Sequence, residues 1–170
     1  ALFTGFGRAK RIVFFDTLLE RLTPDEVEAV LAHELGHFKL KHVLKRLLWM
    51  AAFSLAFLAL LAWLAASPWF YEGLGVPPAP GRPGVALLLF FLALPVFTFF
   101  LAPLSSLYSR RHEFEADLFA AKNASARSLV RALVKLYQDN AATLTPDPLY
   151  SAFHDSHPPA AVRIARLEAA

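Results

Sequence analysis

Three side chains in the stretch 29–37 have the types and spacing of a zinc hydrolase site. His33 and His37 lie four residues apart, and Glu34 directly follows the first histidine. On a helix the three side chains share one face, because His37 lies about 40° and Glu34 about 100° around the axis from His33. Two neutral imidazoles can bind one zinc ion there, while the carboxylate acts as a base for water. His33 and His37 are therefore predicted metal ligands, and Glu34 is a predicted catalytic base.

The HExxH pattern is specific for a chain of this composition. With 6 His in 170 residues, we expect roughly 0.01 chance occurrences of the pattern. The alternative is a helix with two exposed histidines and a solvated glutamate. The chain has no cysteine, so a metal would have to be bound by His, Asp or Glu.

The helix that carries the motif is predicted to cover residues 24–46. Thr23 can cap its start, Pro24 suits the first helical position, and Glu26 completes a capping box. Gly36 costs about 1 kcal/mol of helix propensity, but it would let another segment approach the metal closely. The predicted packing face consists of large apolar residues at helical spacing. These residues are Val27, Leu31, Leu35 and Phe38.

Two uncharged apolar runs, at 47–71 and 85–109, predict a membrane protein. Each run is long enough for a helix to cross a hydrocarbon core of about 30 Å, and we expect transmembrane helices at 47–66 and 85–108. The 56% hydrophobic content exceeds that of a usual soluble protein. The alternative, a pair of core helices in a soluble bundle, is disfavoured because neither run has a polar face.

The distribution of basic residues predicts the topology. Of 17 Lys and Arg, only Arg82 lies between the two runs, so the HExxH side is expected to be cytoplasmic. The net charge of +3 without a continuous basic patch argues against binding of nucleic acid. A high Ala, Leu and Arg content suggests a bacterial inner membrane as the location.

A predicted helix after the second run, beginning near residue 109, brings carboxylates back to the HExxH side. Glu113 and Asp117 lie one turn apart and face the same way, as a metal ligand and a residue that orients a ligand histidine would. Glu115 points roughly opposite, and we favour a solvated ion pair with Arg110 or Arg111 for it.

The two ends of the chain complete the expected organisation. Residues 1–16 predict a β-hairpin whose second strand is apolar on both faces, so that burial is expected. Its edge could pair with an extended peptide, although a purely structural hairpin is an equal alternative. Residues 109–170 are expected to form the C-terminal helical part of the site. The chain begins without methionine, and we expect one metallopeptidase domain over 1–170 that is a fragment of a longer membrane protein.

Several motifs occur together in one order: HExxH at 33–37, E-x-x-x-D at 113–117 and S-H-P-P at 156–159. With two predicted spans between the first and second motifs, the chain resembles the CAAX prenyl protease family of membrane zinc metallopeptidases. Further stretches carry the same resemblance. These are residues 3–7, 11–13, 22–26 and 110–112.

The resemblance implies roles for particular residues. It implies that His33, His37 and Glu113 bind zinc, that Glu34 activates water and that Asp117 supports the site. It also implies that His157 and Arg163 lie beside the substrate carbonyl, where a donor can stabilise an oxyanion. In the family an acidic residue usually precedes this arginine, whereas the chain has Val162. The implied partners are a peptide or prenylated protein, the bilayer, and membrane spans N-terminal to these residues.

We therefore predict a mainly α, polytopic, gluzincin-like zinc endopeptidase with a short β-hairpin and two transmembrane helices. One alternative is a membrane quality-control metalloprotease of the heat-shock type, which shares HExxH and the later carboxylate. Another is a non-catalytic membrane scaffold in which the site is structural or empty. Cleavage of a prenylated peptide, compared with an unprenylated one, separates the CAAX prenyl protease type from the quality-control type. The zinc content of the purified protein tests the scaffold alternative.

Overall fold

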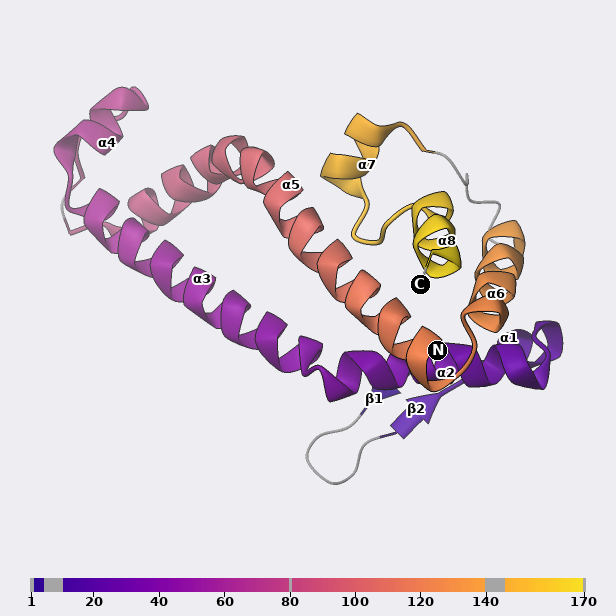
Figure 1. The fold of residues 1–170 in the computed structure, drawn as a ribbon. Coiled ribbons are helices and arrows are strands. Elements are labelled where there is room, and N and C mark those ends of the chain that lie inside the picture. The colour runs from indigo at the N-terminus through magenta and orange to yellow at the C-terminus, as the bar shows by residue number, and fades with distance from the viewer. Residues whose placement is uncertain (1, 5–10, 80, 140–145, 170) are drawn as a thin grey trace. The chain divides into compact units, whose positions relative to one another are not determined.

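A computed structural model describes residues 2–4, 11–79, 81–139 and 146–169 as a mainly α chain with one short hairpin (Figure 1). The predicted fold class is confirmed. The elements in chain order are β1 (Leu2–Thr4), β2 (Arg11–Val13), α1 (Asp16–Arg21), α2 (Pro24–Lys39), α3 (His42–Ala65), α4 (Pro68–Gly73), α5 (Pro83–Asn123), α6 (Ala126–Asp139), α7 (Pro148–His154) and α8 (Ala160–Glu168).

The chain divides into two compact units. The site unit comprises residues 1–43 and 103–170, and the apolar unit comprises residues 44–102. Helices α3 and α5 each contribute residues to both units.

The apolar unit packs the C-terminal part of α3 and α4 against the start of α5. Its core is aliphatic and aromatic, and the Tyr71 hydroxyl donates a 2.9 Å hydrogen bond to the Ala65 carbonyl oxygen. This bond satisfies a carbonyl near the end of α3 that has no partner within the helix. The buried residues are Leu64, Phe70, Tyr71, Ala86, Leu89 and Phe90.

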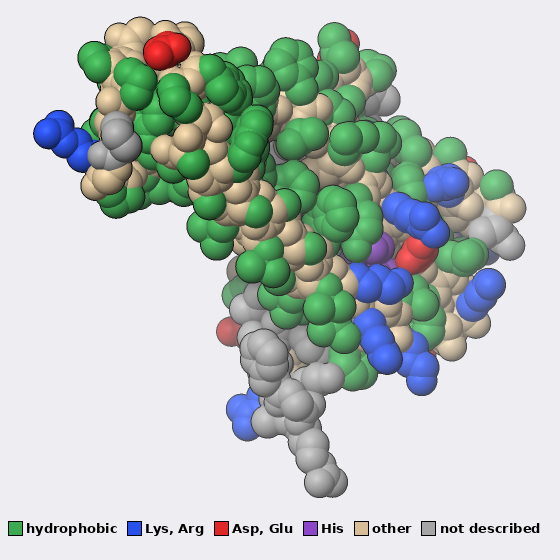
Figure 2. All heavy atoms as spheres, turned by 90° about the vertical axis from the view of Figure 1, so that its left-hand side faces the viewer, with side chains coloured by type: hydrophobic (Ala, Val, Ile, Leu, Met, Phe, Trp, Pro, Cys, Tyr) green, Lys and Arg blue, Asp and Glu red, His purple; other side chains and the backbone are tan. Residues whose placement is uncertain are grey.

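Both long helices are apolar and largely uncovered within this structure. Only 6% of the most apolar window of α3 and 17% of that of α5 is buried. A core helix of a soluble bundle would be covered on most of its surface. Hydrophobic side chains accordingly dominate the face of this unit seen in Figure 2. Each helix is long and apolar enough to cross a membrane.

The helix predicted over 24–46 is two helices. Helix α2 ends at Lys39, and α3 begins at His42. Lys41 has a φ of 58°, a left-handed conformation that a continuous right-handed helix does not contain. The break redirects the chain directly after the HExxH motif.

The second predicted span and the helix expected after it form one continuous helix. Helix α5 runs over 41 residues, from Pro83 to Asn123. Pro95 and Pro103 both lie inside it, as membrane helices tolerate. The apolar segment and the carboxylate motif are therefore parts of the same element.

Small residues take much of the interface of α2, and the predicted packing face was right at Val27, which packs against a buried cluster, but wrong at Leu35 and Phe38. Leu35 and Phe38 are exposed, whereas the small residues of α2 are buried against the other helices. Small side chains let helix backbones approach closely, so they take the interface. The buried core of α2, α5, α6 and α8 consists of Ala29, Ala32, Ala120, Leu129, Leu133 and Leu167.

Glu26 joins the start of α2 to α6. Its carboxylate accepts a 2.9 Å hydrogen bond from the Thr23 backbone N–H, as the predicted capping box requires. The same carboxylate accepts a 2.7 Å bond from Lys135 and lies 3.5 Å from Arg131 on α6. Burial by itself would raise the Glu26 pKa, but the bonds from Lys135 and Thr23 outweigh it and the pKa is lowered.

The predicted hairpin is present as a two-stranded antiparallel sheet. Leu2 pairs with Val13, and Thr4 pairs with Arg11; residues 5–10, which connect the strands, lie outside the described part of the chain. The expected burial of the predicted second strand is found on one face only. Phe14 packs against a buried cluster, whereas Val13 and Phe15 are exposed. A sheet of two strands offers few neighbours to cover both faces.

Candidate metal centre

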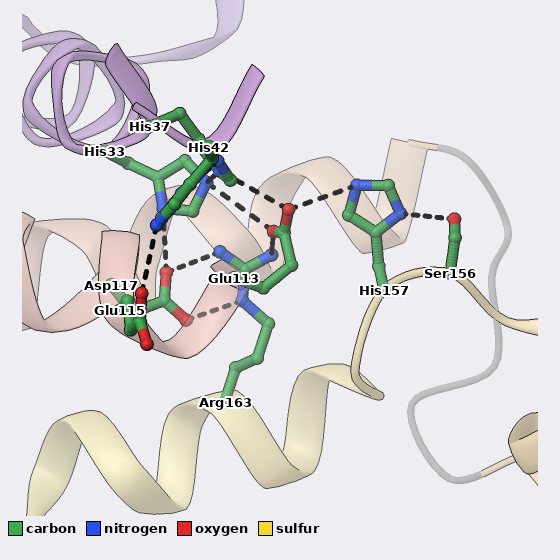
Figure 3. Close-up of polar contacts among 9 residues, drawn as sticks. All are labelled: His33, His37, His42, Glu113, Glu115, Asp117, Ser156, His157 and Arg163. Carbon is green, nitrogen blue, oxygen red and sulfur yellow. Dashed lines mark hydrogen bonds and ion pairs between the residues drawn. The ribbon is translucent and has the colours of Figure 1, made fainter. Parts of the chain in front are cut away.

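His33, His37 and Glu113 converge in the site unit although 76 positions separate His37 from Glu113 in the sequence. The Nε2 atoms of His33 and His37 are 3.2 Å apart. The Glu113 carboxylate lies 3.6 Å from His33 Nε2 and 3.4 Å from His37 Nε2. Figure 3 shows the two imidazoles of α2 facing the carboxylate of α5.

The three donors fit a zinc ion. Bonds of about 2.1 Å in a tetrahedron place neighbouring ligand atoms about 3.4 Å apart. The observed separations of 3.2, 3.4 and 3.6 Å match this spacing. Two histidines and one glutamate also form a donor set of catalytic zinc sites, in which a fourth position stays open.

Gly36 explains how α5 comes so near the motif. A β-carbon at this position would lie 3.1 Å from the Ala116 Cα and 3.1 Å from the Phe119 Cβ. Such contacts are shorter than ordinary van der Waals contacts, so a side chain at this position would overpack the interface. The close approach predicted from this glycine is therefore present, and it places Glu113 within reach of both histidines.

Glu34 lines a cavity of about 290 Å³ together with the three predicted ligands. The side chain is partly buried, and no described residue forms a hydrogen bond or ion pair with it. A carboxylate without a fixed partner is free to exchange a proton with a molecule in the cavity. His157 and Arg163 line the same cavity.

Asp117 lies between a predicted ligand and an arginine. Its carboxylate accepts two hydrogen bonds from Arg163, at 2.8 Å from Nε and 2.6 Å from Nη2. It also lies 2.9 Å from His33 Nδ1, although no well-aligned hydrogen bond joins the two atoms. Asp117 thus stands beside the ring and holds Arg163 in place.

The electrostatics of His33 favour a proton on the ring when no metal is bound. Burial by itself would lower the His33 pKa, but the carboxylates of Asp117 and Glu113 outweigh it and the pKa is raised. A divalent cation would take the place of that positive charge, because it binds the neutral ring.

His157 and Arg163 approach Glu113 from the C-terminal segment. His157 Nε2 lies 3.6 Å from Glu113 Oε1, and Arg163 Nη1 lies 3.6 Å from Glu113 Oε2. The His157 side chain is 63% exposed, so it is accessible to a bound peptide, whereas Arg163 is buried. Arg163 is held by Asp117, and Val162, at the position where the family usually has an acid, points to solvent.

Arg110 anchors the segment that carries His157. Its guanidinium donates to the carbonyl oxygens of Ser151 and Asp155 and to the Ser151 hydroxyl. These are groups of α7 and of the residue that follows it. Arg110 therefore binds oxygens of this segment, and neither Glu113 nor Glu115.

His42 is a neighbour of the site that sequence reasoning missed. Its Nδ1 lies 3.0 Å from His37 Nδ1, and its Nε2 lies 3.1 Å from Glu115 Oε2. On an unbroken helix His42 would sit about 140° around the axis from His37. The left-handed Lys41 turns it back toward the motif. The available signal was a histidine five positions after His37, but the prediction of one helix over 24–46 placed it away from the face of the motif.

The chain is similar to known proteins over nearly its whole length. Residues 1–170 match the model of Peptidase family M48. The chain is 34% identical to CAAX prenyl protease 1 of Saccharomyces cerevisiae, across 99% of the chain and 40% of that protein. It is 37% identical to the CAAX prenyl protease 1 homolog of Arabidopsis thaliana, across 96% of the chain and 38% of that protein.

A solved structure is similar over nearly the whole chain. The crystal structure of S. mikatae Ste24p superposes with a TM-score of 0.85 at 33% identity, and the match covers 98% of the chain and 42% of that protein. The chain spans about two fifths of the length of the curated relatives named above. By the family match over its full length, the chain belongs to peptidase family M48.

Proposed function

We propose that the chain is the catalytic part of a zinc-dependent membrane endopeptidase. One observation carries this proposal: the donor atoms of His33, His37 and Glu113 meet at a cavity that Glu34 also lines. The family match and the apolar helices α3 and α5 support a peptidase embedded in a membrane.

The proposed chemistry assigns separate tasks to these residues. His33, His37 and Glu113 would hold the zinc ion, which polarises a carbonyl and lowers the pKa of water from about 15.7 toward 7. Glu34 takes a proton from the attacking water and passes it to the leaving amine. No covalent bond to the protein forms.

The oxyanion that develops on the substrate carbonyl needs donors. His157 is the exposed donor on the cavity, and Arg163 supplies a fixed positive charge 3.6 Å from Glu113. Donors that are in place before the reaction stabilise developing charge without reorganising. Asp117 keeps the Arg163 guanidinium in position through two hydrogen bonds.

The proposed substrate is a peptide, and a prenylated C-terminus is the specific class. Relatives named CAAX prenyl protease motivate this choice. A second cavity of about 930 Å³ in the site unit has an apolar wall that includes Leu107, Pro148 and Val162, and it would suit an apolar group. The exposed strand β2 offers an edge to which an extended peptide could add.

The proposed location is an integral membrane protein with the site on the cytoplasmic side. The single Arg82 between the two apolar runs supports this orientation through the positive-inside rule. We also propose that membrane segments outside these 170 residues act with them, because the relatives are more than twice as long. The composition suggests a bacterial inner membrane, whereas the relatives named above are eukaryotic.

The test replaces Glu34 by Gln. We expect Glu34→Gln to bind zinc like the wild type and to lose peptide cleavage by about 10²- to 10⁴-fold, because only the proton transfer is removed. Glu28→Gln, an exposed residue on the same helix, is the matched control and should cleave normally. Normal cleavage by Glu34→Gln would contradict the proposed mechanism.

Two peptides of one sequence then separate the candidate substrates. A prenylated C-terminal peptide should be cleaved faster than the unprenylated one if the apolar group is recognised. Equal rates would favour the quality-control type of protease. A purified chain without stoichiometric zinc would favour a non-catalytic scaffold.

A further inference from the structure

His37 has a partner on the side of its ring that faces away from Glu113. His42 Nδ1 lies 3.0 Å from His37 Nδ1, while His37 Nε2 lies 3.4 Å from the Glu113 carboxylate. On its other side, His42 Nε2 lies 3.1 Å from Glu115 Oε2. Figure 3 shows His42 between His37 and Glu115.

Hydrogen-bond chemistry leaves one arrangement of protons that is compatible with a metal. An ionised carboxylate only accepts hydrogen bonds, so His42 Nε2 must donate to Glu115. The neutral His42 ring then has a bare Nδ1, which can only accept. His37 must therefore donate from its Nδ1, and its Nε2 is left with a lone pair directed toward Glu113.

We propose that the carboxylate of Glu115, acting through His42, fixes the proton of His37 on Nδ1 and thereby presents Nε2 to the metal. This proposal rests on the proposed metal site. Ligand histidines commonly donate their second ring nitrogen to a carboxylate or carbonyl oxygen, which orients the ring and raises its basicity. Here an imidazole is inserted between ligand and carboxylate.

The surroundings of His42 suit a positioning role. The residue is 4% exposed, and His112 stacks on its ring with centroids 4.2 Å apart and planes 13° apart. Tyr108 in turn packs edge-on against His112, at 4.4 Å between centroids. The stack holds the His42 ring in one plane, so both of its nitrogens stay aligned with their partners.

The same donors could instead be a second metal site, since ligand atoms of His42, His112 and Glu115 lie within 4.8 Å of one another. The ring geometry favours the hydrogen-bonded chain from Glu115 through His42 to His37, which is called the relay below. Imidazole nitrogens bind metals through lone pairs in the ring plane. The lone pairs of two stacked, nearly parallel rings lie in separate parallel planes, so they do not converge on one ion. A count of bound zinc separates these two arrangements.

The test uses paired substitutions in the 170-residue chain. Glu115→Leu removes the acceptor, and we expect the zinc dissociation constant, measured by competition with a chelator, to rise about 10- to 100-fold. Glu115→Gln keeps a carbonyl oxygen that can accept from His42, and it should stay near the wild type. His42→Phe should weaken zinc binding in the same way, whereas His42→Asn keeps an oxygen at the position of Nδ1 and should restore it.

A spectroscopic measurement separates this role from a merely structural one. The ¹⁵N signals of the His37 ring should show a protonated Nδ1 in the wild type and in Glu115→Gln, and a mixture of tautomers in metal-free Glu115→Leu. Unchanged zinc affinity and tautomer in Glu115→Leu would overturn the relay. Two zinc ions in the wild type and one in Glu115→Leu would also overturn it. A wild type that binds no zinc would contradict the proposed function and the relay together.

Discussion

Two groups of two histidines and one glutamate lie next to each other in the site unit, and they differ in ring geometry. In the first group the rings of His33 and His37 meet at 75°, and the donors line a cavity. In the second group the rings of His42 and His112 are stacked at 13°. The rings of the second group therefore meet face to face, while the ring nitrogens of His42 contact His37 and Glu115.

The comparison shows that donor identity alone does not make a metal site. Both groups offer imidazole nitrogens and a carboxylate at short range. All three donors of the first group line one cavity, which Glu34 also lines, whereas the two rings of the second group are stacked. Ring orientation and access to a cavity separate a candidate catalytic centre from the residues that support it.

The largest expected effect tests this distinction directly. Glu113→Ala should lose stoichiometric zinc, because one of three protein ligands is removed. Glu115→Ala should still bind one zinc per chain when zinc is in excess, although more weakly. Elemental analysis of the two purified variants measures the difference. The reverse result would assign the metal to the second group.

A smaller effect is expected for two ion pairs, one beside each group. Asp117→Asn removes the carboxylate charge that forms two hydrogen bonds with the buried Arg163, and it should reduce the free energy of unfolding by about 3–5 kcal/mol. Arg111 is 77% exposed in its pair with Glu115, so Arg111→Gln should cost about 0–1 kcal/mol. Denaturant unfolding of both variants measures the two costs. Similar costs would mean that burial does not distinguish these pairs.

Glu26→Gln should destabilise the fold without touching either group. The Glu26 pKa is lowered in the folded chain from an ordinary value of 4.5. Its charge therefore stabilises the fold above about pH 4.5, and this stability is lost as the pH falls toward the folded pKa. We expect the free energy of unfolding to fall by about 1.5–3 kcal/mol at pH 7 and by less in acid. Unfolding curves at several pH values measure this difference. A pH-independent loss would contradict this origin, and zinc content should not change.

Gly36→Ala should affect stability less than Asp117→Asn or Glu26→Gln, but it should have a specific effect on the first group. The added β-carbon meets the Ala116 backbone, and the cost of overpacking exceeds the gain of about 1 kcal/mol in helix propensity. We expect a net loss of about 1–2 kcal/mol and weaker zinc binding, because α5 and Glu113 move away from α2. Gly73→Ala, which meets no atom within 4 Å, is the matched control. Unchanged zinc affinity in Gly36→Ala would show that the close approach does not set the ligand distances.

Local patterns predicted the centre better than the packing around it. The spacing of His33 and His37 fixes their common face, and the carboxylate motif lies beyond two apolar runs that return the chain. Their meeting with Glu113 was therefore predictable, and the small size of Gly36 predicted the close approach. The roles of these residues in binding and catalysis remain predictions.

Other features were not predictable from periodicity. The left-handed Lys41 ends one helix and starts another, which brings His42 to the site against the expectation for a single helix. Leu35 and Phe38 were predicted to pack but are exposed, because the close approach of α5 at Gly36 gives much of the interface to the small residues of α2.

The location of bound metal is the most direct test of the central claim. Diffraction data collected at the zinc edge, from crystals of the chain grown with zinc, would reveal each bound ion as an anomalous peak. We predict one peak between His33, His37 and Glu113. A peak between His42, His112 and Glu115 instead, or no peak, would contradict the account.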